Sequence, residues 1–199
     1  MKKLIPIIIL AGAIAIAFFA PHRIAKNPDP DHTHADFAVW IDGKQLDFSD
    51  EKYMSGSSKE ESAGGHPHEH LHESLHLHDG NGHVIHRHKP GLTIGDFFDS
   101  LSMPLTDACL TVNARRSYCI ENGKHWRMFV NEKEIPFGPN YVFQDGDAIL
   151  LTWGSDDIVI AEQLKMLTHD ACLYSKTCPE RGAPPTESCI ADPTVPCKQ

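Results

Sequence analysis

The stretch HTHADFAVWI, residues 32–41, alternates between two kinds of side chain and decides how the chain folds. Successive side chains in a β-strand point to opposite sides, so a period of two predicts a half-buried strand. The apolar side is formed by Ala35, Phe37, Val39 and Ile41, and the other side by His32, His34 and Asp36. Asp42-Gly43 predicts a tight turn that returns the chain into a second strand at residues 44–48.

A second alternating stretch, LHLHDGNGHVIHRH at residues 75–88, predicts a hairpin with histidines on one face. A three-residue loop at residues 80–82 pairs His76 with His86. This register collects Leu75, Leu77 and Ile85 on one face and, on the other, His76, His78, His86 and His88. A two-residue turn would mix the faces, because a one-residue slip moves every side chain to the opposite side of the sheet. We therefore expect the longer loop.

The rest of the chain predicts a short helix between strand pairs and a second helix near the end. Thr93 is a suitable N-cap with Asp96 three residues on, and Phe97, Phe98 and Leu101 form the apolar side. Strand-like segments follow at residues 109–112, 118–120, 126–130 and 148–153. A helix capped by residues 155–157 is predicted to bury Ile158, Ala161, Leu164 and Met166 or Leu167. This order of elements predicts an α+β domain with a mixed sheet.

The N-terminus predicts a membrane segment. An apolar run at residues 4–20 lies between Lys2-Lys3 and Arg23, and its seventeen residues, at about 1.5 Å rise each, can just cross a bilayer core. Lys2-Lys3 favours a cytoplasmic N-terminus, so we expect a single-pass protein of the cell membrane with its domain on the extracytoplasmic side. A cleaved signal peptide is the alternative, which the bulky Phe18 disfavours. In both interpretations the domain is exported.

The six cysteines agree with an exported protein, because disulfides persist in oxidising compartments. Cys109 and Cys119 are the expected pair within the domain. Three pairings remain open in the tail for Cys172, Cys178, Cys189 and Cys197. We expect the chain beyond His169 to be a disulfide-stapled appendage with little to bury.

These features divide the chain into three parts. Residues 1–23 are the anchor or signal, residues 24–154 a His-rich metal-binding α+β domain with a mobile loop at 55–73, and residues 155–199 a helix plus a Cys- and Pro-rich tail. The formal net charge of −9 argues against a nucleic-acid partner, because binding phosphates needs a basic face. The expected partners are the membrane, a metal ion and an exported protein.

The histidines carry the chemical signal: there are 14, and nine of them lie between His66 and His88. Neutral imidazole is a good ligand for transition metals, and histidines two residues apart on a strand point the same way, about 7 Å apart. We expect a divalent Zn or Cu ion. The expected ligands are His34, His78, His86 and His88, followed by His32 and His76. Asp36 and Asp79 are expected to accept hydrogen bonds from the far ring nitrogens.

Alternatives remain open at this stage. The alternating histidines can instead be a polar outer face, and residues 66–72 can be a solvated low-complexity loop rather than a metal-buffering one. For function, a protein that sequesters or transfers metal ranks first, and a pH- or metal-sensing interaction domain second. A Zn-dependent enzyme ranks third: Glu69 and Glu73 could serve as a base, but no His-Glu-x-x-His signature occurs.

Two resemblances add to this interpretation. Residues 126–153 resemble the last part of transcobalamin-like β-grasp domains, in Phe129-Val130-Asn131-Glu132-Lys133 and Asp145-Gly146-Asp147, although Glu132 stands where that pattern usually has Gly. This resemblance implies a β-grasp-like mixed sheet with one central short helix.

The chain from His32 to Gly154 also resembles uncharacterised exported, membrane-anchored, His-rich proteins of small-genome bacteria. The resemblance rests on the segments at residues 32–37, 76–80 and 84–91, and on the tail at 178–182. That family brings no established function, so it supports only the choice of histidines.

Overall fold

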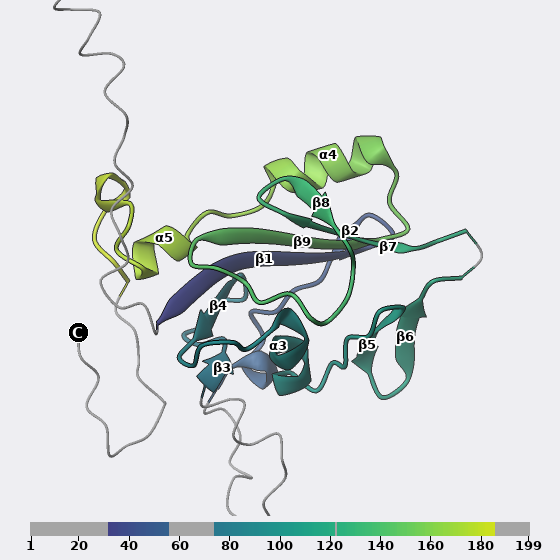
Figure 1. Cartoon of the computed structure of the whole chain (residues 1–199), viewed down its shortest axis with the longest axis horizontal. Helices are drawn as coiled ribbons and strands as arrows, with labels where there is room; N and C mark the ends of the chain where they lie inside the picture. Colours follow the sequence, from purple (N-terminus) through teal and green to yellow (C-terminus); the bar gives the residue numbers. More distant parts are fainter. Residues whose placement is uncertain (1–31, 56–73, 122, 186–199) are drawn as a thin grey trace, which may run out of the picture.

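The computed structural model describes residues 32–55, 74–121 and 123–185 (Figure 1). The expected membrane segment, most of the expected mobile loop with the histidines at 66–72, and the last two cysteines lie outside the described residues. Within the described part of the chain, no helix has both the length and the apolar character needed to cross a bilayer.

A mixed seven-stranded sheet forms the centre of this α+β fold, as the sequence predicted at the level of fold class. Its main strands, in spatial order, are β3 (Leu75–His76), β4 (Val84–Arg87), β1 (Thr33–Ile41), β9 (Asp147–Trp153), β7 (Trp126–Val130) and β8 (Lys133–Ile135). The short β2 (Lys44–Gln45) pairs with the end of β1. The two central strands, β1 and β9, run parallel, and the other neighbours are antiparallel.

Two of the expected tight turns have the backbone geometry that hairpins require. Asp42 and Gly43 between β1 and β2 both have positive φ, as do Asn131 and Glu132 between β7 and β8. Positive φ at both central residues matches the turn to the twist of the strands. Glu132 therefore adopts the left-handed conformation that the resemblance assigned to glycine.

One face of the sheet is covered by α3 (Ile94–Ser100), below the sheet in Figure 1. Its N-cap is the predicted one: Thr93 and Asp96 bond each other's backbone N–H groups in a capping box. Phe97 and Phe98 are fully buried against the predicted apolar face of β1. Leu75, Leu77 and Ile85 join the same core, so the predicted faces of the second hairpin are confirmed.

The opposite face of the sheet is also covered, which corrects the prediction of a half-buried β1. There, α4 (Asp157–Lys165) packs over Trp40 and Leu150. The predicted buried side of α4 is wrong in part: Ile158 is 79% and Met166 59% exposed, Ala161 is exposed, and Leu164 is only partly buried. The buried positions are Ile160, Gln163 and Leu167, of which Leu167 was one of the two alternatives predicted for the last position. The predicted and the observed buried positions both have helical spacing. Contact of α4 with the sheet, which is distant in sequence, determines which positions are buried.

The hairpin of β5 (Cys109–Asn113) and β6 (Arg116–Cys119) carries the predicted disulfide between Cys109 and Cys119. Two indole N–H groups attach it to the sheet, since Trp126 donates to the carbonyl of Tyr118 and Trp153 to that of Cys119. Both tryptophans are buried.

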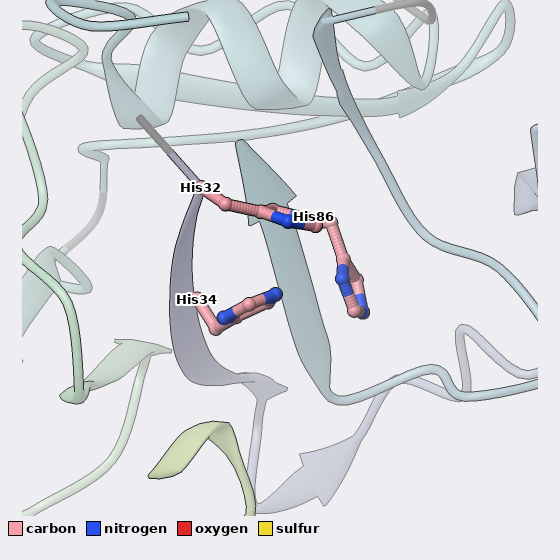
Figure 2. Close-up of side chains that lie close together, drawn as sticks. All are labelled: His32, His34 and His86. Carbon is pink, nitrogen blue, oxygen red and sulfur yellow. The ribbon is translucent and has the colours of Figure 1, made fainter. Parts of the chain in front are cut away.

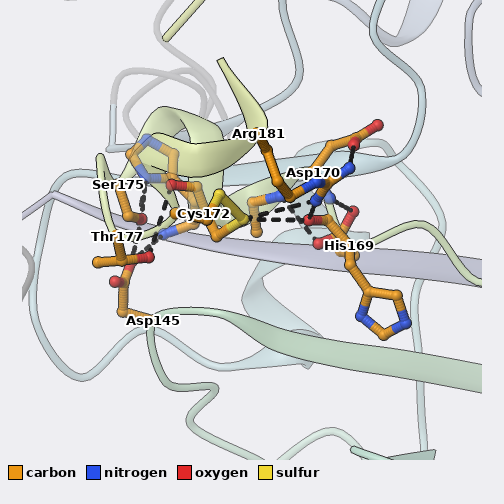
Figure 3. The surroundings of a disulfide bond; sticks show 11 residues. Asp145, His169, Asp170, Cys172, Ser175, Thr177 and Arg181 are labelled. Atoms are coloured by element: carbon orange, nitrogen blue, oxygen red, sulfur yellow. Dashed lines mark hydrogen bonds and ion pairs between the residues drawn. A yellow bond between two sulfur atoms is a disulfide. The ribbon is translucent and has the colours of Figure 1, made fainter. Parts of the chain in front are cut away.

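The described part of the tail, residues 170–185, is not an appendage with little to bury. Its helix α5 (Ala171–Tyr174) lies against β1, and a second disulfide joins Cys172 to Cys178 (Figure 3). Asp36 of β1, 1% exposed, accepts hydrogen bonds from the hydroxyl of Thr168 and from the backbone N–H groups of Asp170 and Ala171. A buried carboxylate thus satisfies the first N–H groups of α5 and fixes the tail to the sheet.

Replacing Asp36 should detach this helix. Because Asp36→Ala removes three hydrogen bonds to a buried, charged acceptor, we expect the free energy of unfolding to fall by about 2–4 kcal/mol, measured by urea denaturation. Asp47→Ala is the matched control: its carboxylate accepts hydrogen bonds from Ser49 in an exposed turn, so a change within about 0.5 kcal/mol is expected. Equal effects of the two substitutions would contradict the assigned role of Asp36.

Candidate metal centre

Strand pairing aligns histidines from three strands. His34 of β1 lies opposite His86 of β4, and His86 lies opposite His76 of β3. Residues directly opposite each other in antiparallel strands share a face and have Cβ atoms about 4.5–5.5 Å apart. The predicted pairing of His76 with His86 is therefore confirmed, and three imidazoles form a row across the sheet.

All six expected ligands meet in one group, here called the histidine cluster: His32, His34, His76, His78, His86 and His88. Their rings follow one another in a closed circuit. In the order 32, 34, 86, 78, 76, 88 and back to 32, the ring centroids are 4.6, 4.8, 3.9, 5.5, 4.9 and 4.0 Å apart. Four members are at most 3% exposed, and His32 and His88 at one end are partly exposed.

Three members of the cluster could hold one metal ion. One nitrogen each from His32, His34 and His86 can be chosen so that all lie within 4.8 Å of one another. Figure 2 shows these side chains approaching one another from two neighbouring strands. Two nitrogens on a tetrahedral Zn ion are about 3.3 Å apart, given Zn–N bonds of about 2.05 Å, so small side-chain rotations would close the set. His32, which ranked behind His78 and His88 in the sequence analysis, thus belongs to the set that could hold one ion.

The tail fixes which nitrogen of His34 can bind a metal. The Ser175 hydroxyl donates to Asp145 Oδ1, so at His34 Nδ1, 2.8 Å away, it must act as the acceptor (Figure 3). This chain of hydrogen bonds places the proton of the neutral ring on Nδ1 and the lone pair on Nε2. The same Asp145 oxygen also accepts from the backbone N–H of His34 at 3.0 Å. Such support from a carboxylate orients a ligand and raises its basicity.

The two carboxylates expected to support ligands have different roles. Asp79 Oδ2 lies 2.7 Å from His78 Nδ1, as expected, and leaves Nε2 as the nitrogen directed away from that carboxylate. Asp36 instead binds the start of α5, so its observed bonds serve the tail. The assignment of Asp79 agrees with the structure, whereas Asp36 acts on the cluster only through the helix that it holds.

Tyr174 of α5 covers one side of the cluster. Its ring centroid lies 4.8 Å from that of His86 and 5.6 Å from that of His34. Its hydroxyl accepts a hydrogen bond of 2.8 Å from Asn81 in the loop before β4. The disulfide loop therefore contributes an aromatic wall as well as the Ser175 hydroxyl.

Burial keeps three members of the cluster neutral, His34, His86 and His88. Desolvation, followed by repulsion from neighbouring imidazoles, lowers the pKa of His34 to about 2 and that of His88 to about 3. The pKa of His86 is also lowered well below its usual value for the same reasons. Neutral imidazoles have the lone pair that a metal ion requires, so at neutral pH these three histidines are in their ligating form.

Sequence reasoning missed three residues that shape the centre: Asp145, Ser175 and Tyr174. Asp145 and Ser175 were not linked to any histidine, because they lie 111 and 141 residues from His34 in the chain. The available signal was the Asp-Gly-Asp turn before β9, the strand that pairs with β1 in parallel. The tail itself shows no alternation or helical period strong enough to predict its docking.

The lowered pKa values predict acid sensitivity of the metal-free protein. Between about pH 6.5 and pH 3 the unfolded chain binds protons at these histidines while the folded chain does not, so the free energy of unfolding falls as the pH falls. We expect a lower urea midpoint at about pH 5 than at about pH 7.5. Changing His34, His86 and His88 to Gln should flatten this dependence. His125→Gln, at an exposed position, should leave it unchanged, and an equal slope in both variants would contradict the prediction.

Removing the Ser175 hydroxyl should weaken metal binding. Because Ser175→Ala breaks the link between His34 Nδ1 and Asp145, we expect the affinity for Zn²⁺ to fall by about 10-fold to 100-fold, measured by competition with a chelating dye. Thr177→Ala lies in the same disulfide loop, where its hydroxyl faces the carbonyl of Cys172, and serves as the control. Indistinguishable affinities in the two variants would remove Ser175 from the centre.

Comparison of this chain with protein-family models, with curated proteins and with solved structures finds no match. The two resemblances noted from the sequence therefore stay predictions. Any function has to be inferred from the histidine cluster and from the residues that surround it.

Proposed function

We propose that this protein binds a divalent transition-metal ion, Zn²⁺ or Cu²⁺, outside the cytoplasm and sequesters it or passes it on. The observation that carries the proposal is the approach of three imidazole nitrogens, from His32, His34 and His86, to within 4.8 Å of one another. A polar outer face of a sheet would not need this convergence, and its histidines would be exposed. Here His34 and His86 are 2% and 0% exposed.

The surroundings favour holding an ion over leaving it open to solvent. Tyr174 covers one side, and the Ser175–Asp145 pair orients one ligand. The partly exposed end with His32 and His88 offers a route by which an ion could enter or be handed on. Additional imidazoles beside the triad would let an ion exchange ligands one at a time, as transfer requires.

The donor set favours a borderline divalent ion. All six candidate ligands offer nitrogen, which suits Zn²⁺ and Cu²⁺. Cu⁺ usually recruits sulfur, but Met54 and Met103 are buried in the core on the opposite face of the sheet, beside α3. The two disulfides leave no free cysteine among the described residues.

The extracytoplasmic location is part of the proposal. It is supported by the two disulfides, because such bonds persist in oxidising compartments. The apolar run at residues 4–20 adds the expectation of a membrane anchor. We also propose a β-grasp-like arrangement, supported by the parallel central pair of the first and last strands of the sheet with α3 across one face.

A second candidate is a metal- or pH-sensing interaction domain. It is favoured by one observation: α5 and its disulfide loop contact the cluster directly, through Ser175 and Tyr174. Occupancy or protonation of the cluster could thus change how the tail lies on the sheet and what exported partner it meets. This candidate predicts weak metal binding together with pH-dependent association.

The test measures the metal content of two full-length chains, one with the intact triad and one in which His32, His34 and His86 are changed to Ala. We expect the chain with the intact triad to retain Zn²⁺ or Cu²⁺ after dialysis, and the variant to lose most of the affinity because three ligands are removed. Both chains need His66, His68, His70 and His72 replaced by Ser, so that the loop does not bind metal.

His125→Ala in the same loop-substituted chain is the control, because this histidine is exposed and is no member of the cluster. Circular dichroism checks that the triad variant is folded. Equal metal content in the triad variant and the control would refute the proposed site. Retention of metal only by chains with the original loop would move binding to residues 66–72.

A further inference from the structure

The histidine cluster contains a second set of possible ligands beside the triad. His76 belongs to β3, His78 to the loop that follows it, and His88 comes directly after β4; all three are members of the same histidine cluster as the triad. His76 lies between the other two: its ring centroid is 5.5 Å from that of His78 and 4.9 Å from that of His88. These three histidines are here called the outer set.

The outer set has features that a purely structural role does not explain. His76 and His78 are each only 3% exposed, although Thr, Lys or Glu would serve on an ordinary polar face. Nε2 of His88 is buried and has no hydrogen-bond partner within the described part of the chain. A buried nitrogen without a partner costs free energy unless a ligand satisfies it.

A hydrogen bond to Asp79 fixes the orientation of the His78 ring. Asp79 holds Nδ1 of His78 at 2.7 Å, and an acceptor at Nδ1 places the ring proton there and the lone pair on Nε2. Asp79 thus accepts a hydrogen bond from Nδ1 of His78, as Ser175 does from Nδ1 of His34. Two separate supports for two separate imidazoles are more than a single three-ligand site requires.

The spacing of two of the three ring pairs in the outer set fits ligation by one ion. With metal–nitrogen bonds of about 2.05 Å, two imidazoles on one tetrahedral ion have centroids about 5 Å apart. The two centroid distances from His76, 5.5 and 4.9 Å, are close to this value, as are the 4.6 and 4.8 Å from His34 to the other two rings of the triad, whose own centroids are 6.4 Å apart. His86 of the triad approaches His78 to 3.9 Å, so the two sets adjoin.

We propose that the cluster binds two divalent ions, the first at the triad and the second at His76, His78 and His88. This inference rests on the proposed metal-binding function and extends it from one ion to two. A protein with adjoining sites can store an ion in one and exchange it through the other, which fits sequestration or transfer. Each site would complete its coordination with water or with a neighbouring imidazole.

The test counts Co²⁺ ions bound by the full chain in the background with Ser at positions 66, 68, 70 and 72. Spectroscopic titration should give two ions per chain. The double variant His76→Asn, His78→Asn should bind one, because the triad is intact. The matched control is His83→Asn combined with His125→Asn: it also removes two histidines, of which His83 faces Asp170, and it should still bind two.

Binding of one ion by the parent chain, or of two by the double variant, would overturn the inference and leave the proposed function standing. No bound Co²⁺ in the parent chain would refute both. A measurement without variants guards against misfolding: with two equivalents of Cu²⁺, adjoining ions should show dipolar coupling in the electron paramagnetic resonance spectrum. An uncoupled spectrum at that loading would also overturn the inference.

Discussion

The register between β1 and β4 is the constraint on which the histidine cluster depends. Pairing of His34 with His86 places both side chains on one face, and Ala35 with Ile85 on the other. A slip by one residue would exchange the faces, burying imidazoles against α3 and pushing Ile85 under α5. The apolar core therefore enforces the register, and the register assembles the cluster. Stability and ligand geometry follow from the same set of backbone hydrogen bonds.

The tail supplies hydrogen-bond partners for buried polar side chains of the sheet. β1 carries two buried polar side chains on its second face, and each has a partner from the tail: Asp36 binds the start of α5, and His34 meets Ser175 just after it. The disulfide between Cys172 and Cys178 closes the loop that carries Ser175 and Tyr174. Cross-linking reduces the number of conformations this loop has when undocked, which lowers the entropy cost of holding it on the sheet.

Local patterns in the sequence predicted a large part of this architecture. Alternation gave the faces of β1 and of the second hairpin, and Thr93 with Asp96 gave the start of α3. These signals are local because strands and caps depend on neighbours within a few residues. The phase of α4 was wrong in part because Ile158 and Ile160 both fit helical spacing, and only contact with Trp40 and Leu150 distinguishes them. The docking of α5 was missed for the same reason: its partners lie more than 130 residues away.

The second face of the sheet is divided into an apolar half and an imidazole half, and this division is an argument for function. Beneath α4, Trp40 and Leu150 bury apolar surface, which stabilises the fold. A few residues along the same strand, His34 is equally buried, and desolvation lowers its pKa to about 2. Apolar residues there would avoid the loss of stability on acidification. A bound ion offers a compensating gain, about 2.7 kcal/mol at a hundred times its Kd, because only the folded chain assembles the ligands. The proposed metal binding would explain why polar rings occupy a position where the fold alone would favour aliphatic side chains.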